Sequence, residues 1–257
     1  MPEFCQLTQD DAIWTVTINR PEVMNAVHPP TNYELDEIFA GFEADPSARV
    51  AILTGAGDKA FCAGNDLKYL AEHRKVELPP TGFAGLTKNY SRTKPIIAAV
   101  NGLALGGGFE IALACDLIIA AESARFGLPE PRIGLAASGG GLHRLPRQLG
   151  LKHAMGMILT GRHVWAPEAF SLGFVNEVVA GEEVQSSARK WADAIVSCAP
   201  LAIATSMRIV GESLNTAEFP TAHENDAPHI EALRKSADAI EGPESFVEKR
   251  APRWQGR

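Results

Sequence analysis

The chain has 257 residues, of which 46% are hydrophobic and 21% are charged, so it can bury a full core in one large domain, with or without a small appendage. Its formal net charge of −7 arises from 31 acidic and 24 basic residues, and no run of Lys or Arg is of the kind that neutralises a phosphate backbone. This composition argues against nucleic acid as a main partner.

The four cysteines, Cys5, Cys62, Cys115 and Cys198, are widely spaced. They form neither the C-x-x-C pair of a zinc site nor the dense framework of a small secreted domain, so we interpret them as free thiols in a reducing cytoplasm. The N-terminal sequence MPEFCQLTQDD is acidic and lacks the basic and apolar regions of a signal peptide. We therefore expect a cytoplasmic protein without a metal site.

Continuous apolar runs predict strands at residues 14–20, 50–55, 95–102 and 116–121. Such runs suit sheets that are covered on both faces, and helices should alternate with them. The strands are expected in the first two-thirds of the chain.

The clearest early helix is predicted at about residues 31–44. Thr31 and Glu34 have the spacing of a capping box, in which each side chain satisfies a backbone amide of the first turn. One apolar face follows, made of Leu35, Ile38, Phe39 and Phe42.

Residues 73–94 are polar, punctuated by Pro and Gly, and weakly periodic. This pattern predicts a mobile surface segment rather than core, and its place in the chain suggests that it borders a substrate entrance.

Residues 96–121 are nearly apolar and long enough to span a bilayer. However, Asn101, Glu110 and Asp116 lie inside this stretch, and ionisable groups are costly at membrane depth. We therefore interpret it as a buried strand, turn, helix and strand, and expect no membrane span.

Helical patterns occur at residues 107–115 and dominate beyond residue 140. One such helix has its apolar positions at Val184, Ala188, Trp191 and Ile195. Beyond about residue 199 the sequence is helical, with few strand signals. We expect a core at 1–198 and a helical region at 199–257.

The most informative segment is the glycine-rich turn at residues 101–110, which follows a predicted strand and opens a helix. Glycines let backbone N–H groups approach a ligand, and a helix N-terminus favours developing negative charge. A second turn, at residues 61–67, also follows a strand and precedes a helical start. Two such turns can direct two N–H groups at one oxygen, which is what an oxyanion hole requires.

Alone, each turn has an ordinary structural explanation. A dinucleotide-binding turn is the main functional alternative, but neither a G-x-G-x-x-G nor a G-x-x-x-x-G-K-[ST] pattern is present.

Five stretches in register resemble the crotonase, or enoyl-CoA hydratase/isomerase, family. They are NRPEVMNAV (19–27), AFCAGNDLK (60–68), AAVNGLALGGGFEIALACD (98–116), ARFGLPE (124–130) and EGPESFVEKR (241–250). The resemblance spans almost the whole chain. It implies an α/β fold, a spiral of repeated ββα units with a C-terminal helical region, that assembles as trimers or as hexamers of two trimers.

The resemblance also implies the chemistry and its residues. The backbone N–H groups of Asn65 and Gly107 would hold the thioester carbonyl of an acyl-CoA substrate, and Glu110 and Glu130 match the two acids of hydratases. Coenzyme A would be part of the substrate, and no separate cofactor is expected. The function implied is hydration of a 2-enoyl-CoA thioester to a 3-hydroxyacyl-CoA, or the reverse dehydration.

Independent reasoning about the two glutamates agrees with this function. Hydration needs a base that takes a proton from water and an acid that delivers one to carbon, and two neighbouring carboxyls holding one proton do both. Each glutamate also has a plain structural explanation: Glu110 as an acid favoured in the first turn of a helix, and Glu130 as a loop acid beside Pro131.

Further residues are assigned to substrate binding by the same resemblance. They are Ala26, Ala63, Ser138, Phe246 and Lys249, of which Ala26, Phe246 and Lys249 should lie near the coenzyme A nucleotide. Phe246 and Lys249 would reach the site of a neighbouring subunit. A C-terminal Lys among Glu and Arg is also commonly just solvated.

The chain departs from the hydratase pattern beside the second glutamate. Ala137 and Ser138 replace a Pro-Gly pair, in which the glycine lies beside the reactive water, and Leu128 replaces the usual Gln of F-G-Q-P-E. These changes keep both acids but leave the acyl substrate and the exact reaction open.

Two alternatives therefore remain. One keeps the fold but changes the chemistry to double-bond isomerisation or C–C cleavage. The other is a non-catalytic or RNA-binding member of the family, for which a lost catalytic acid or a basic surface would be expected.

Overall fold

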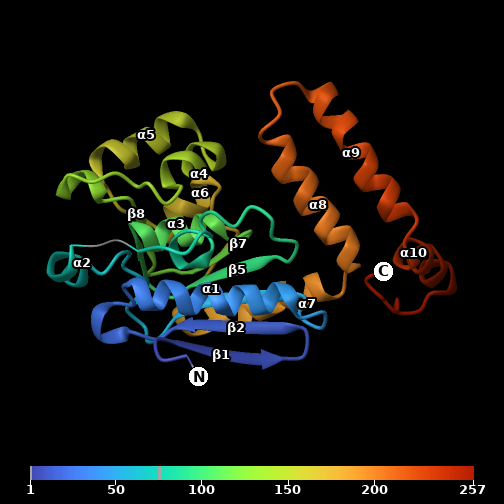
Figure 1. Cartoon of the computed structure of the whole chain (residues 1–257), viewed down its shortest axis with the longest axis horizontal. Helices are drawn as coiled ribbons and strands as arrows, with labels where there is room; N and C mark the ends of the chain where they lie inside the picture. The colour runs from blue at the N-terminus through green and yellow to red at the C-terminus, as the bar shows by residue number, and fades with distance from the viewer. Residues whose placement is uncertain (1, 75–76) are drawn as a thin grey trace.

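Two β-sheets organise the molecule in a computed structural model that describes residues 2–74 and 77–257 (Figure 1). The larger sheet has six strands in the order β1-β2-β3-β5-β7-β10. Their bounds are β1 Cys5–Asp10, β2 Ile13–Ile18, β3 Val50–Gly55, β5 Ile96–Val100, β7 Leu117–Ala121 and β10 Glu177–Val179. β1 and β2 form an antiparallel hairpin, and the other neighbours are parallel.

The smaller sheet has the order β4-β6-β8-β9, with β4 Ala60–Cys62, β6 Leu103–Leu105, β8 Arg125–Gly127 and β9 Val164–Trp165. Consecutive strands form three pairs: β3 with β4, β5 with β6, and β7 with β8. In each pair the first strand belongs to the larger sheet and the second to the smaller sheet, and a helix follows the pair. This repetition confirms the predicted spiral of ββα units.

All the predicted strands are present. β3 and β5 are buried along their whole length, and both contact α7 (Val184–Val196) and the strand β4 of the smaller sheet. The expectation that strands end within the first two-thirds of the chain was wrong for β10. With three residues, β10 is too short to give a strand pattern.

Helix α1 (Pro29–Ala44) covers the hairpin, with Trp14 of β2 packed 5.6 Å from Phe42 between ring centroids. Its predicted capping box was wrong. Pro29 and Pro30 begin the helix two residues earlier, since proline fits the first helical turn, and His28 is the N-cap. The Glu34 carboxylate instead accepts the backbone N–H groups of Glu3 and Phe4 at 2.7 and 2.9 Å.

Residues 73–94 are only partly a surface segment, and residues 75–76 of this range lie outside the described residues. Phe83, Leu86 and their neighbours Ala84 and Thr87 are buried, so the prediction was wrong for this part. A Cβ atom added at Gly85 would lie 2.6 Å from Cα of Asp36 in α1, and the glycine has φ +68. The segment therefore packs directly on the α1 backbone. Its many polar residues gave no sequence signal for this burial.

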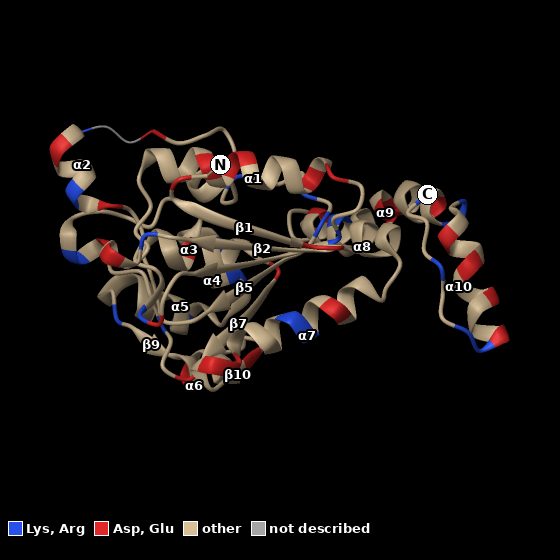
Figure 2. Ribbon diagram, turned by 90° about the horizontal axis from the view of Figure 1, so that it is seen from below, with Lys and Arg blue, Asp and Glu red and all other residues tan. Residues whose placement is uncertain are grey.

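The remaining helices follow the prediction in broad terms. They are α2 Leu67–His73, α3 Gly107–Ala114, α4 Gly141–Gln148, α5 Leu151–Thr160, α6 Ala166–Leu172, α8 Pro200–Ser213, α9 Phe219–Arg234 and α10 Ala237–Glu248. Helices α8, α9 and α10 form an arm that stands away from the sheets in Figures 1 and 2. The predicted C-terminal helical region is thus present, while its independence as a unit stays a prediction.

The apolar stretch at 96–121 forms the predicted strand, helix and strand as β5, α3 and β7, but the predicted turn contains a further short strand, β6. No single helix in the described ranges is long and apolar enough to cross a membrane. All four cysteines are free thiols. Figure 2 shows Lys and Arg interspersed with Asp and Glu along the ribbon.

Candidate active site

The two glycine-containing turns predicted from the sequence touch each other. A Cβ atom added at Gly64, where φ is +96, would lie 2.8 Å from the carbonyl oxygen of Leu105 and 3.0 Å from the amide nitrogen of Gly107. A Cβ added at Gly108 would overlap the carbonyl oxygen of Cys62. Because these positions have no room for a side chain, glycine is what lets the turns after β4 and β6 meet.

The amides of Asn65 and Gly107 are left without a backbone acceptor in the part of the chain that the structure describes. Around Asn65, Val27 donates to the carbonyl of Gly64 at 2.8 Å and accepts from the amide of Asp66 at 3.0 Å. Because Val27 pairs with the residues on both sides of Asn65, the N–H of Asn65 points away from Val27. Gly107 is the first residue of α3, where helical geometry leaves the N–H free. The arrangement offers two donors from adjoining turns.

Phe83 covers the Gly107 turn. A Cβ atom added at Gly107 would lie 2.6 Å from Cε1 of the Phe83 ring. The segment at 81–87 therefore borders the candidate site, as its place in the chain suggested, but as a buried wall. Phe83 was not identified from the sequence. The available sequence signal was its position between Gly82 and Gly85, and both glycines have positive φ in the structure.

Glu110 lies in the first turn of α3 and is only 5% exposed. Its Oε1 accepts the backbone N–H of Gly141 at 2.8 Å. Burial, assisted by the charge of Glu130, raises the pKa of Glu110 to about 7, although the N–H groups of Gly141 and Gly139 oppose the shift. Near neutral pH this carboxyl is therefore divided between its two protonation states.

Glu130 opens the short 3₁₀ helix Glu130–Ile133, which follows β8. Its Oε1 lies 3.2 Å from the place that a Cβ at Gly106 would occupy, directly before Gly107. Its Oε2 is buried and has no hydrogen-bond partner among the described residues, and burial raises the pKa of this carboxyl. A buried carboxyl oxygen without a partner is suited to a reacting ligand or water.

Arg144 of α4 is a further residue of the site that sequence reasoning missed. Its Nη2 donates to the carbonyl of Thr87 at 2.9 Å, which ties α4 to the wall segment. Its positive charge lowers the pKa of Glu110 and so opposes the effect of burial. One arginine among many gave no sequence signal for this role.

The residues that depart from the hydratase pattern lie beside Glu110. A Cβ atom added at Gly141 would be 3.1 Å from each of Leu128 Cδ1, Ala137 Cβ and Glu110 Oε1. Leu128 and Ala137 are buried, whereas Ser138 is exposed and donates its N–H to Ala136 O at 2.8 Å. Replacing a polar Gln with Leu128 thus adds apolar surface beside the acid.

The other predicted binding residues fall into two groups, Ala26 and Ala63 beside the turn at Gly64 and Asn65, and Phe246 and Lys249 far from it. Ala26 is buried, and its carbonyl accepts from Nη1 of Arg20 at 2.5 Å. The amide of Ala63 donates to Met24 O at 3.0 Å. Phe246 is 85% exposed and Lys249 ends α10, so both lie on the arm, away from the glutamates of the same chain (Figure 1).

No group of three or more His, Cys, Asp or Glu side chains within 2–74 and 77–257 is placed to hold a metal ion.

The pKa of Glu110 has a consequence for stability. Its folded value of about 7 exceeds the ordinary 4.5, so the protonated carboxyl is favoured in the folded state, and this stability is lost as the pH rises from about 4.5 to 7. Glu110→Gln removes the ionisation. We therefore compare the unfolding free energy of the variant with that of the wild type at each pH. This difference should increase in favour of the variant by about 2 to 3 kcal/mol from pH 5 to pH 8.5.

Urea denaturation at the two pH values measures this gain. Glu182→Gln, at an exposed position, is the matched control and should show no such pH dependence. An equal effect of Glu110→Gln at both pH values would contradict the raised pKa.

Comparison with known proteins agrees with the resemblance. The sequence pattern of the family described as enoyl-CoA hydratase/isomerase matches residues 8–257. A carnitinyl-CoA dehydratase of Escherichia coli strain K12 is 44% identical over 265 residues, and the match covers 100% of both chains.

Solved structures give the same result. An enoyl-CoA hydratase from Mycobacterium tuberculosis H37Rv superimposes with a TM-score of 0.94 at 39% identity, over 100% of both chains. An enoyl-CoA hydratase from Bacillus anthracis gives a TM-score of 0.92 at 32% identity, over 99% of this chain and 100% of that one. The chain belongs to the crotonase (enoyl-CoA hydratase/isomerase) family, among its hydratase-like and dehydratase-like enzymes.

Proposed function

We propose that the protein adds water across the double bond of a 2-enoyl-CoA thioester to give a 3-hydroxyacyl-CoA, or catalyses the reverse dehydration. The observation that carries this proposal is the pair of carboxyls, buried Glu110 and half-buried Glu130, beside two amides without backbone partners in the described part of the chain. Two acids with raised pKa values near one donor pair match a reaction that moves two protons and develops charge on one oxygen.

In this mechanism the thioester carbonyl accepts the N–H groups of Asn65 and Gly107. Glu110 takes a proton from water as the water oxygen bonds to C3, and the electrons of the double bond shift toward the carbonyl. The two amides stabilise the resulting enolate oxygen. Glu130 delivers its proton to C2, and the reverse reaction uses the same groups in the opposite roles.

The raised pKa values support a pair of acids that shares one proton, while the assignment of base and acid rests on the resemblance to hydratases. Burial of both carboxyls and the mutual repulsion of their charges favour a state in which the pair holds one proton. That state is the one from which hydration starts. The rate should therefore fall both when the pair is fully protonated and when it is fully ionised.

We also propose that the coenzyme A moiety runs past Ala26 and Ala63 and that the chain forms a trimer or a hexamer. The arm of α8 to α10 supports assembly, because it exposes large apolar side chains to solvent in the single chain. These are Val210, Leu214, Phe219, Ile240, Phe246 and Val247. In such an assembly Phe246 and Lys249 would reach the coenzyme A of a neighbouring subunit.

The role of the Gly107 amide is tested by a matched pair of substitutions. Gly107→Ala adds the Cβ that meets the Phe83 ring but keeps the N–H, whereas Gly107→Pro adds similar bulk and removes the N–H. Proline is tolerated at the first position of a helix. We expect kcat of Gly107→Pro to fall about 10²- to 10³-fold below that of Gly107→Ala.

Steady-state kinetics on a 2-enoyl-CoA, with circular dichroism to confirm folding, makes this comparison. Equal kcat values for the two variants would show that the amide donates no catalytic hydrogen bond.

The paired acids are tested by Glu110→Gln, Glu130→Gln and the double variant. Each single change keeps the size of the side chain and removes its proton transfer, so we expect kcat to fall about 10²- to 10⁴-fold while thioester binding changes far less. Because both acids act on one proton path, the loss in the double variant should be much smaller than the product of the single losses.

Multiplicative losses would indicate independent roles. If Glu130→Gln were fully active and Glu110→Gln inactive, a single acid would suffice, and the reaction would be an isomerisation rather than a hydration.

A further inference from the structure

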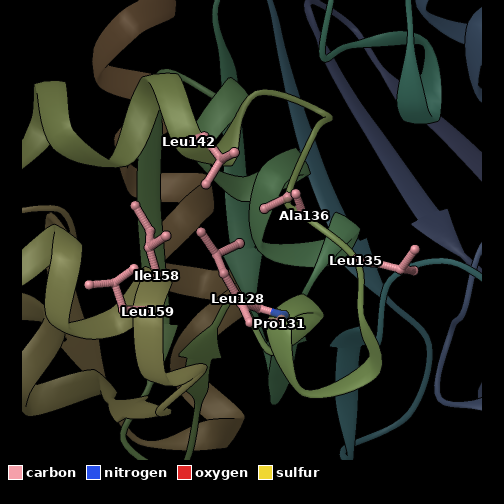
Figure 3. A pocket seen from close by; sticks show the side chains of 8 residues that line it. Leu128, Pro131, Leu135, Ala136, Leu142, Ile158 and Leu159 are labelled. Atoms are coloured by element: carbon pink, nitrogen blue, oxygen red, sulfur yellow. The ribbon is translucent and has the colours of Figure 1, made fainter.

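An apolar recess of about 200 Å³ lies beside the acid pair. It is lined by Leu128, Pro131, Leu135, Ala136, Ala137, Leu142, Ile158 and Leu159. Figure 3 shows the side chains of Leu128, Leu142 and Ile158 directed toward one another, from the end of β8, from α4 and from α5. Apolar cavities of about 150 Å³ hold a molecule as large as benzene, so this recess can hold the end of a short acyl chain.

The recess adjoins both glutamates. Leu128 Cδ1 and Glu110 Oε1 each lie 3.1 Å from the position of a Cβ added at Gly141, so Leu128 separates the acid from the recess by one side chain. Pro131, another lining residue, directly follows Glu130. Leu128 and Pro131 therefore connect the recess to the surroundings of both acids, where the acyl end of a bound thioester would lie.

The lining has no charged, polar or aromatic side chain. Basic groups in the neighbourhood belong to Arg132, whose Nε donates to Thr160 O at 3.1 Å beside Leu159, and to His143 and Arg144 of α4. Of the nearby acids, Glu110 is bonded to Gly141 and lies near the Arg144 charge, and Glu130 faces Gly106. A cation placed in the recess would lose water and gain neither an aromatic face nor a carboxylate of its own.

We propose, building on the proposed function, that this recess binds the acyl end and selects an uncharged aliphatic group against a trimethylammonium group. The acyl specificity of this protein would then differ from the one that the name carnitinyl-CoA dehydratase gives to the Escherichia coli relative, because a carnitinyl group ends in trimethylammonium. Leu128, Leu142 and Ile158 are the residues that determine this selectivity.

Two unreactive thioesters of equal shape test the proposal. In 5,5-dimethylhexanoyl-CoA the chain ends in a tert-butyl group, and in 4-(trimethylammonio)butanoyl-CoA a positively charged nitrogen replaces its central carbon. Isothermal titration calorimetry gives Kd for each. We expect the wild-type protein to bind the neutral thioester at least about tenfold more tightly, since the cation is desolvated without a partner. Equal binding, or tighter binding of the cation, would overturn the proposal.

A pair of variants locates the selectivity in the recess. Leu142→Asp supplies a carboxylate, and Leu142→Asn is its neutral control of the same size. Leu142 is 37% exposed and lies in the first turn of α4, where an acid is compatible with the helix dipole. Leu142→Asp should reduce the preference for the neutral thioester about tenfold more than Leu142→Asn does.

Leu159→Asp and Leu159→Asn repeat the comparison at a position that is 67% exposed, in case the first pair fails to fold. If Asp and Asn variants that fold show the same preference, the acyl end lies elsewhere and the proposal fails.

Binding of saturated thioesters requires no turnover, so this outcome is independent of the reaction. If the protein prefers the neutral thioester but hydrates no 2-enoyl-CoA, only the proposed function is contradicted. Hydration of short neutral 2-enoyl thioesters with equal binding of the two probes would contradict only the selectivity.

Discussion

The contact between the turn after β4 and the turn after β6 is the constraint on which the rest of the site depends. Gly64 and Gly108 lie so close to the opposite turn that any side chain there would overlap backbone atoms. This approach places the amides of Asn65 and Gly107 at adjoining positions and starts α3 at a fixed point. Since Glu110 lies in the first turn of α3, the same contact also fixes one of the two acids.

The two candidate acids lie in surroundings that disfavour their charged forms. Glu110 is held by the Gly141 amide and lies near the Arg144 charge, yet burial still raises its pKa to about 7. Leu128 contributes apolar surface where the hydratase pattern has a polar Gln. The apolar surroundings that shift the acid therefore continue into the recess where we place the acyl end, so acid strength and substrate choice share residues.

The sequence was most informative where a local pattern has a single physical cause. Buried strands such as β3 and β5 appear as unbroken apolar runs, and the glycine turns are visible between a strand and a helix. The roles of both glutamates come from the family resemblance. The start of α1 was mispredicted because two prolines extended the helix past the apparent cap. Phe83 and Arg144 could not be assigned, since their roles depend on contacts with distant segments: Phe83 packs on Gly107, and Arg144 bonds to Thr87.

The fate of the water atoms tests hydration most directly. With hex-2-enoyl-CoA in water enriched in ¹⁸O and deuterium, mass spectrometry should find one ¹⁸O at C3 and one deuterium at C2 of a 3-hydroxyhexanoyl product. The ¹⁸O atom reports the water that attacks C3 as Glu110 takes its proton, and the deuterium reports the proton that Glu130 delivers to C2. A six-carbon product with a shifted double bond and no ¹⁸O would contradict hydration.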